Sequence, residues 1–195
     1  MNVAIIGWGS LVWDKRGLKT RSPWYSDGPV LPVEFARISE GGRVTLVIIP
    51  GKKKSPTCWA LSAHTDLDTA KNELVQREGI RDPRDIHGVT KERRLIGPPG
   101  GMTSVFTTVL KWLREQNDLD AAIWTGLELN WEHKLRKKHS AKAVVDYLSG
   151  LTGDTREKAK EYFVRAPRCI DTPVRRMVEE QLGWAPASDH DGCIN

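Results

Sequence analysis

The 195-residue sequence lacks a long hydrophobic run, since no apolar stretch approaches the roughly 20 residues needed to span a bilayer. Its first residues have no basic segment of the kind that opens a signal peptide, and they are typical of a strand that begins at once. Cysteine is scarce: Cys58, Cys169 and Cys193 are scattered and form no C-x-x-C pair, so we expect no disulfide framework. These absences predict a cytoplasmic protein without a membrane partner.

Patterns for metals and nucleic acids are missing as well. His133 and His139 lie six residues apart, so they do not share a helix face as an i, i+4 pair of ligands would, and we expect no metal site. The net charge of +5 favours anionic ligands through long-range attraction. The basic clusters at 52–54 and 134–139 nevertheless lack interleaved aromatic residues on which bases could stack. We therefore expect no nucleic-acid partner, and no particular oligomeric state is favoured.

Local patterns predict an α+β protein. With 39% hydrophobic and 28% charged residues, the chain has the composition of a globular protein of one main domain. Short β-rich runs bounded by turn residues predict strands at 3–6, 30–38, 44–49, 57–62 and 121–125, with a charged edge strand at 89–96. Apolar spacings of three and four predict helices at 66–78, 103–113, 140–148, 155–164 and 173–182. We expect the main domain over 1–125, a helical extension packed on it over 126–184, and a flexible tail over 185–195.

A strand that runs into glycines opens the chain, with the sequence Ile-Ile-Gly-Trp-Gly-Ser-Leu over 5–11. Two glycines around one large residue leave backbone N–H groups free to approach carboxylate or phosphate oxygens. A dinucleotide-binding fingerprint is excluded, because Val12 holds the third glycine position and residues 11–29 supply no crossover helix. A tight turn without a ligand is the competing interpretation. Ser10 lacks the G-x-S-x-G frame of a nucleophile elbow.

Glu78 lies in the final turn of a predicted helix, directly before the helix-ending Gly79. The carbonyl end of a helix carries partial negative charge, so a carboxylate there is disfavoured and its pKa is expected to rise. Burial in a cavity would raise the pKa further, towards the value that suits a general base near neutral pH. The competing interpretation is a solvated glutamate beside Arg77.

Two of these segments together resemble the γ-glutamyl cyclotransferase-like family, which includes the ChaC-type and BtrG-type enzymes. They are the strand-Gly-x-Gly-Ser-Leu opening and the Arg-Glu-Gly-Ile stretch over 77–80, which closes a helix after the fourth strand. Leu11-Val12-Trp13 is also similar to the Leu-Met-Trp that follows the loop in ChaC-type proteins. The resemblance covers about the first 125 residues. It implies a small mixed β-barrel or sheet with flanking helices, to which the helical C-terminal extension is added. Trp8 stands where the family usually has tyrosine, which removes a hydroxyl that could bind substrate.

The resemblance also implies a reaction, in which the α-amine of a γ-glutamyl compound attacks its own γ-carbonyl. The products are 5-oxoproline and a free amine, and the site mainly has to fold the substrate and move protons. Glu78 is the implied general acid and base, the partner is a small-molecule γ-glutamyl substrate, and no metal or organic cofactor takes part. The loop amides would hold the substrate carboxylate or the developing oxyanion. The implied substrate-binding residues are Gly7, Trp8, Gly9, Ser10 and Leu11.

Arg37 is a further candidate for the substrate site. It alternates with Val33 and Phe35 on a predicted strand, so its side chain could face inward and bind a carboxylate, although an exposed arginine fits the same pattern. Two other functions compete with the enzyme. One is a non-catalytic binding protein of the same fold, and the other is a serine hydrolase built around Ser10.

Overall fold

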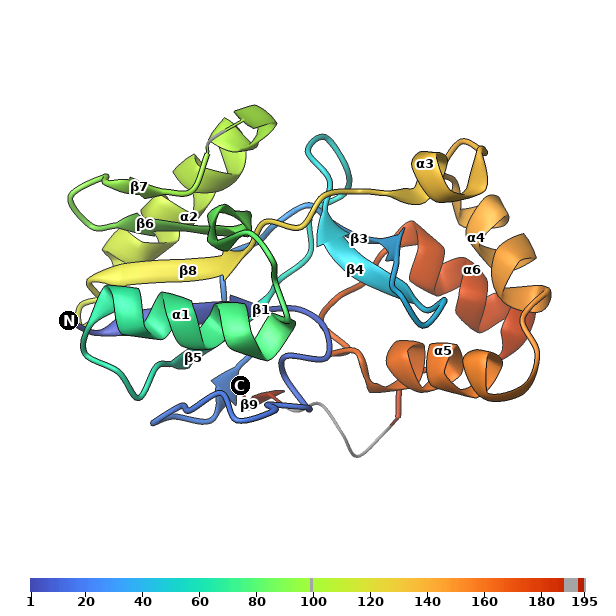
Figure 1. Ribbon diagram of the computed structural model, residues 1–195, viewed down its shortest axis with the longest axis horizontal. Coiled ribbons are helices and arrows are strands. Elements are labelled where there is room, and N and C mark those ends of the chain that lie inside the picture. Colours follow the sequence, from blue (N-terminus) through green and yellow to red (C-terminus); the bar gives the residue numbers. More distant parts are fainter. Residues whose placement is uncertain (99, 188–192, 195) are drawn as a thin grey trace.

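A computed structural model describes residues 1–98, 100–187 and 193–194 of the chain (Figure 1). It contains both helices and strands in a mixed α+β architecture, as predicted. The strands are β1 (Val3–Gly7), β2 (Trp24–Tyr25), β3 (Val33–Ile38), β4 (Val44–Ile48), β5 (Cys58–Leu61), β6 (Ile86–Thr90), β7 (Leu95–Ile96), β8 (Ala121–Thr125) and β9 (Cys193–Ile194). The helices are α1 (Leu67–Glu78), α2 (Thr103–Glu115), α3 (Trp131–Leu135), α4 (Ala141–Ser149), α5 (Gly153–Arg165) and α6 (Pro173–Leu182), with short 3-10 helices at Pro83–Asp85 and Gly100–Met102.

Seven strands form one mixed sheet in the order β7-β6-β8-β1-β5-β2-β9. The central strand β1 pairs in parallel with β8 and antiparallel with β5, and β6 pairs antiparallel with both β8 and β7. Within the described part of the chain, the edge strands β7 and β9 do not pair with each other. The sheet is therefore open, and the barrel that the resemblance offered as one possibility is not formed.

Alternate residues of the central strands face two different helices. Val3 and Ile5 of β1 belong to the same apolar cluster as Leu74 of α1. Ala4 and Ile6 belong to the cluster that contains the apolar residues of α2. Successive side chains of a strand point to opposite faces, so α1 and α2 cover opposite faces of the sheet, as Figure 1 shows. Every residue of β1 is consequently buried.

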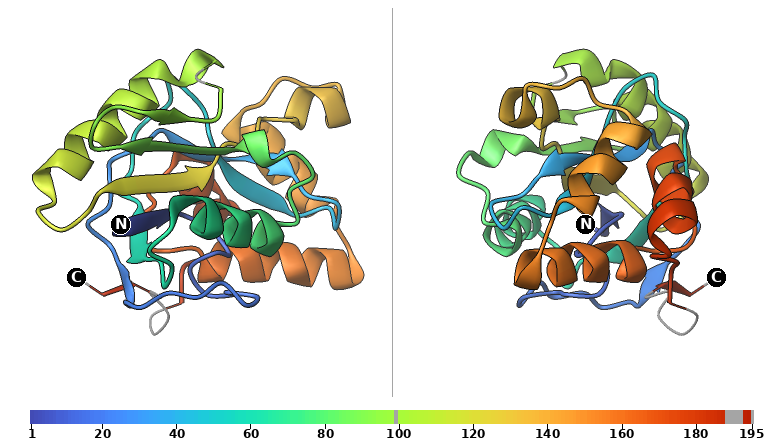
Figure 2. Two further views of the ribbon diagram at one scale, coloured as in Figure 1. Left: turned by 60° about the vertical axis from the view of Figure 1, so that its left-hand side comes forward. Right: turned by 90° about the vertical axis from the view of Figure 1, so that its right-hand side faces the viewer.

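The strands β3 and β4 form a separate antiparallel hairpin, against which the C-terminal helices pack. Phe35 of β3 stacks on Phe163 of α5, with their ring centroids 4.1 Å apart. Val144 of α4 and Val178 of α6 are fully buried in the same apolar cluster. Figure 1 shows the hairpin between the sheet and these helices, and Figure 2 shows the arrangement from two further sides.

Some local predictions were wrong. The segment 89–96 was expected to be one edge strand, but it contains the end of β6, a turn and β7. Arg93 takes a left-handed conformation in that turn, with φ of 71°. The strand β6 lies between β7 and β8 and is buried at all five positions, so it is an interior strand. The short strand β2 was not predicted, because two residues are too few to show a period. The basic cluster at 134–139 is typical of the polar side of a helix, but α3 ends at Leu135.

The segment 185–195, expected to be a flexible tail, lies partly outside the described residues, which in this region are 185–187 and 193–194.

Cys58 on β5 is disulfide-bonded, which the scattered cysteine spacing did not predict. Among the described residues, no helix is both long enough and apolar enough to cross a membrane.

Candidate functional site

A cavity of about 390 Å³ lies where the loop after β1, the end of α1 and the β3–β4 hairpin meet. Its lining includes the glycine loop, Gly7 to Leu11, on one side and Glu78 on another. Tyr162 of α5 also lines it. The structure thus brings together two segments that lie about seventy residues apart in the sequence.

The glycine loop turns sharply because its residues bond to one another. Val12 donates its N–H to the carbonyl of Gly9 at 3.0 Å, and Asp14 donates to the carbonyl of Ser10 at 2.8 Å. Among the described residues, no acceptor receives the main-chain N–H groups of Gly9, Ser10 and Leu11. Amides in such a row bind anionic oxygens. The loop is therefore suited to hold a carboxylate or an oxyanion.

Glu78 is placed at the cavity by the way α1 ends. Gly79 takes the left-handed conformation at φ 63°, and its N–H group bonds to the carbonyls of Gln76 and Val75. The Glu78 side chain is 18% exposed. Burial raises the pKa of its carboxyl, while the neighbouring Arg77 partly opposes that shift. The carboxyl therefore sits in a partly buried, proton-accepting position rather than in open solvent.

Arg77 is the most deeply buried ionised group of the site, with its side chain 2% exposed. It donates to the Glu78 carboxylate at 2.6 Å, to the Ser10 hydroxyl at 3.3 Å, and to the carbonyl of Asp14. It therefore ties the end of α1 to the glycine loop. A signal for this burial was present in the sequence, because Arg77 continues the helix face whose buried residues are Leu67, Ala70 and Leu74.

Trp8 and Arg37 line the cavity, and each donates a hydrogen bond to a main-chain carbonyl. The Trp8 side chain is buried, and its Nε1–H donates to the carbonyl of Leu46 at 3.2 Å. It thus fastens the loop to β4 and has no second donor for a ligand. Arg37 is half-buried and donates to the carbonyl of Glu128 at 2.6 Å. A register shift between Phe35 and Arg37 breaks the simple alternation from which the direction of Arg37 was argued.

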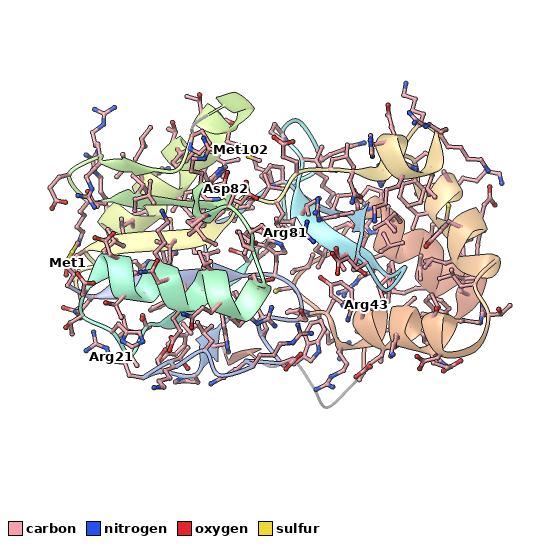
Figure 3. All side chains as sticks on the ribbon, viewed as in Figure 1. Met1, Arg21, Arg43, Arg81, Asp82 and Met102 are labelled. Atoms are coloured by element: carbon pink, nitrogen blue, oxygen red, sulfur yellow. The ribbon has the colours of Figure 1, made fainter. Side chains whose placement is uncertain are left out.

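The cavity carries an excess of positive charge. Its ionised side chains are the glutamates Glu40 and Glu78 and the arginines Arg16, Arg37, Arg43 and Arg77. Among the residues described, Arg43 forms no salt bridge, and its guanidinium lies 5.9 Å from the centre of the Tyr162 ring. Figure 3 labels Arg43 on the hairpin side and Arg81 beyond the end of α1. Such a surface favours an anionic ligand over a cation.

Arg43 and Tyr162 are among the cavity residues that were not found from the sequence. Arg43 follows the hairpin turn, and Tyr162 lies on a helix of the C-terminal third, 5% exposed. The α5 periodicity predicts that Tyr162 is buried, but no local pattern indicates what it faces. Only the packing of α5 against β4 brings its hydroxyl to the loop.

Other chemistries find less support in this lining. No histidine belongs to the described lining, and the Ser10 hydroxyl is bonded to Arg77, which cannot act as a base. Throughout the described residues, no group of three or more His, Cys, Asp or Glu side chains could hold a metal ion. The chemistry that the cavity offers is that of the partly buried Glu78 carboxylate, the exposed Glu40 carboxylate, several arginines and a row of amides.

Comparisons with known proteins do not identify a function for this chain. No family model matches the chain, and no curated protein matches it in sequence. The chain is similar to a solved yeast structure described as a γ-glutamyl cyclotransferase specific to glutathione. The identity is 13%, the alignment covers 94% of this chain and 98% of that one, and the TM-score is 0.45. A similarity at this level does not extend to activity or substrate.

Proposed function

We propose that the protein cyclises a γ-glutamyl amine or peptide to 5-oxoproline with release of the free amine. The observation that carries the proposal is the shared cavity, in which a carboxyl with a raised pKa lies with a row of main-chain N–H groups that have no acceptor among the described residues. A proton acceptor and an oxyanion-binding loop are the two parts that an intramolecular acyl transfer needs. The motif resemblance over 5–11 and 77–80 supports the same reaction.

In the proposed reaction, Glu78 takes a proton from the α-ammonium group of the substrate. The freed amine then adds to the γ-carbonyl, forming the new C–N bond and leaving negative charge on the carbonyl oxygen. The amides of Gly9, Ser10 and Leu11 stabilise that charge. The bond to the leaving nitrogen then breaks. Over the whole cycle the α-nitrogen gives up two protons and the leaving nitrogen gains two, and Glu78 carries them between the two atoms.

A panel of γ-glutamyl amines and peptides, assayed for 5-oxoproline, tests the activity. We expect Glu78→Gln to lower turnover about 10²- to 10⁴-fold, the range for loss of a general acid and base, while the fold is kept. Glu34→Gln is the matched control, because Glu34 is also a buried glutamate with a raised pKa but does not line the cavity. Unchanged turnover in Glu78→Gln would refute the assignment.

A binding protein without turnover is the second candidate, and the ion pair between Arg77 and Glu78 favours it. A carboxylate held at 2.6 Å by a buried arginine is a weaker base than a free one in the same cavity. Calorimetric titration with the same panel separates the two functions. Binding without any release of 5-oxoproline would support the binding protein.

A further inference from the structure

The hydroxyl of Tyr162 lies directly against the glycine loop. A Cβ atom added at Gly9 would fall 2.2 Å from this oxygen, so only glycine leaves room for the hydroxyl at that position. The residue comes from α5, about 150 positions after the loop, and its ring is buried. The hydroxyl therefore shares the cavity wall with the amides that follow Gly9.

The Tyr162 hydroxyl accepts one hydrogen bond, and it donates none among the described residues. Its oxygen accepts the main-chain N–H of Leu46 at 3.2 Å. Among the residues that the structure describes, no acceptor receives its proton. A phenol has one proton to donate, and buried donors are nearly always paired. The proton is thus available to an oxygen atom of a ligand in the cavity.

This hydroxyl acts as a donor and not as a base. Burial raises the pKa of Tyr162 to about 12, and the negative charge of Glu78 shifts it in the same direction. The group therefore keeps its proton throughout the neutral range. Its ring is held edge-on by Trp13 and Phe35, at centroid distances of 5.5 and 6.2 Å. A donor fixed in this way needs little reorganisation when a ligand binds.

We propose that the Tyr162 hydroxyl donates a hydrogen bond to a ligand oxygen bound beside Gly9. The identity of that oxygen rests on the proposed cyclisation, in which it is the γ-carbonyl oxygen of the substrate. It becomes negatively charged when the α-amine adds and is neutral again when the leaving C–N bond breaks. Tyr162 keeps its proton throughout, and the protons move through Glu78 as described above. Tyr162 thus joins the loop amides as a side-chain donor to the same atom.

Binding measurements test the donor without relying on turnover. The probes are 5-oxoproline, which carries a lactam carbonyl, and cyclopentanecarboxylate, which has the same ring size and carboxylate without the lactam group. We expect the wild-type protein to prefer 5-oxoproline, and Tyr162→Phe to weaken its binding about five- to tenfold, the effect of one neutral hydrogen bond. Binding of cyclopentanecarboxylate should stay unchanged in Tyr162→Phe.

Tyr147→Phe is the matched control. Its hydroxyl donates to the carbonyl of Gly42 at 2.7 Å, next to the same hairpin, but Tyr147 does not line the cavity. It should bind both probes as the wild-type protein does, and thermal melting of both variants reports any loss of folding. Since the comparison of the two probes on the wild-type protein needs no variant, a wild-type protein without preference for 5-oxoproline overturns the proposal by itself.

Turnover separates this proposal from the proposed function. If the wild-type protein releases 5-oxoproline, we expect Tyr162→Phe to lower kcat about 10- to 100-fold with KM nearly unchanged. Equal kcat in the two proteins overturns the role of Tyr162 and leaves the activity in place. If no γ-glutamyl compound is turned over but 5-oxoproline binding depends on Tyr162, the activity is wrong and the donor is supported.

Discussion

Glu78 is the residue on which the proposed chemistry depends, and its environment sets a pH dependence. Burial raises the pKa of its carboxyl above the value of about 4.3 for an exposed glutamate, with Arg77 limiting the rise. Because the proposed base must be ionised, we expect kcat/KM to fall on acidification with a midpoint above that of an exposed carboxyl. The measurement is a pH profile of kcat/KM in the wild-type protein and in Glu34→Gln, whose profile should have the same acid limb.

The same shift has a defined sign in stability. The folded protein holds the Glu78 proton more tightly than the unfolded chain does. The contribution of this group to the free energy of unfolding is therefore fully present below the unfolded pKa, and it is lost as the pH rises through the folded pKa. In the pH profile of kcat/KM, an acid limb with the midpoint of an exposed glutamate would contradict the burial of Glu78 in the active protein.

The sequence predicted some residues of the cavity and missed others. The glycine loop and Glu78 were found because each carries a local pattern, and the resemblance joined the two patterns. The burial of Arg77 follows from the 3.6-residue period that also buries Leu74, although this period was not extended to it. The position of Tyr162 depends on packing between α5 and β4, which no local spacing encodes.

The element that positions the site is α1, and its ends follow ordinary capping rules. The Asp66 carboxylate accepts the N–H of Thr69 at the start, and Gly79 ends the helix in the left-handed conformation. The end at Gly79 was predicted from the sequence, whereas either Asp66 or Asp68 could have capped the start. The strand pairing of β6 and β7 was not predicted, since the turn between them depends on Arg93 adopting a positive φ.

Gly79→Ala tests whether the geometry of this helix end matters to the site. An alanine Cβ would meet no atom within 4 Å, so the cost is the left-handed conformation itself, about 1 kcal/mol of unfolding free energy. We expect urea unfolding to show that loss and turnover to fall as well, because Glu78 directly precedes the cap.

Gly183→Ala is the control for that substitution. Gly183 ends α6 with φ of 67°, a nearly identical conformation, and it also has open space around the added Cβ. The control should lose a similar unfolding free energy and keep full turnover. Equal effects of the two substitutions on turnover would mean that the end of α1 has no special role.

We propose that residues 126–184 are an extension of one domain and not a separate unit. A single apolar cluster contains Ile6 of β1, Phe35 of β3 and Val178 of α6, so the core runs through both parts of the chain. The cavity has the same composite origin, since Glu78 precedes position 125 and Tyr162 follows it. The cavity wall therefore depends on both parts being folded together.

A shared core predicts one cooperative unfolding transition. Ile6→Val in β1 and Ile170→Val between α5 and α6 remove one buried methylene group each, and both positions belong to that cluster. Each substitution should lower the unfolding free energy by about 0.5–1.5 kcal/mol and shift the whole transition. Far-UV circular dichroism and tryptophan fluorescence in urea should give coincident midpoints for both variants. If Ile170→Val moved only one of two separate steps, the C-terminal helices would form an independent unit, and Tyr162 would reach the loop only through docking of two folded parts.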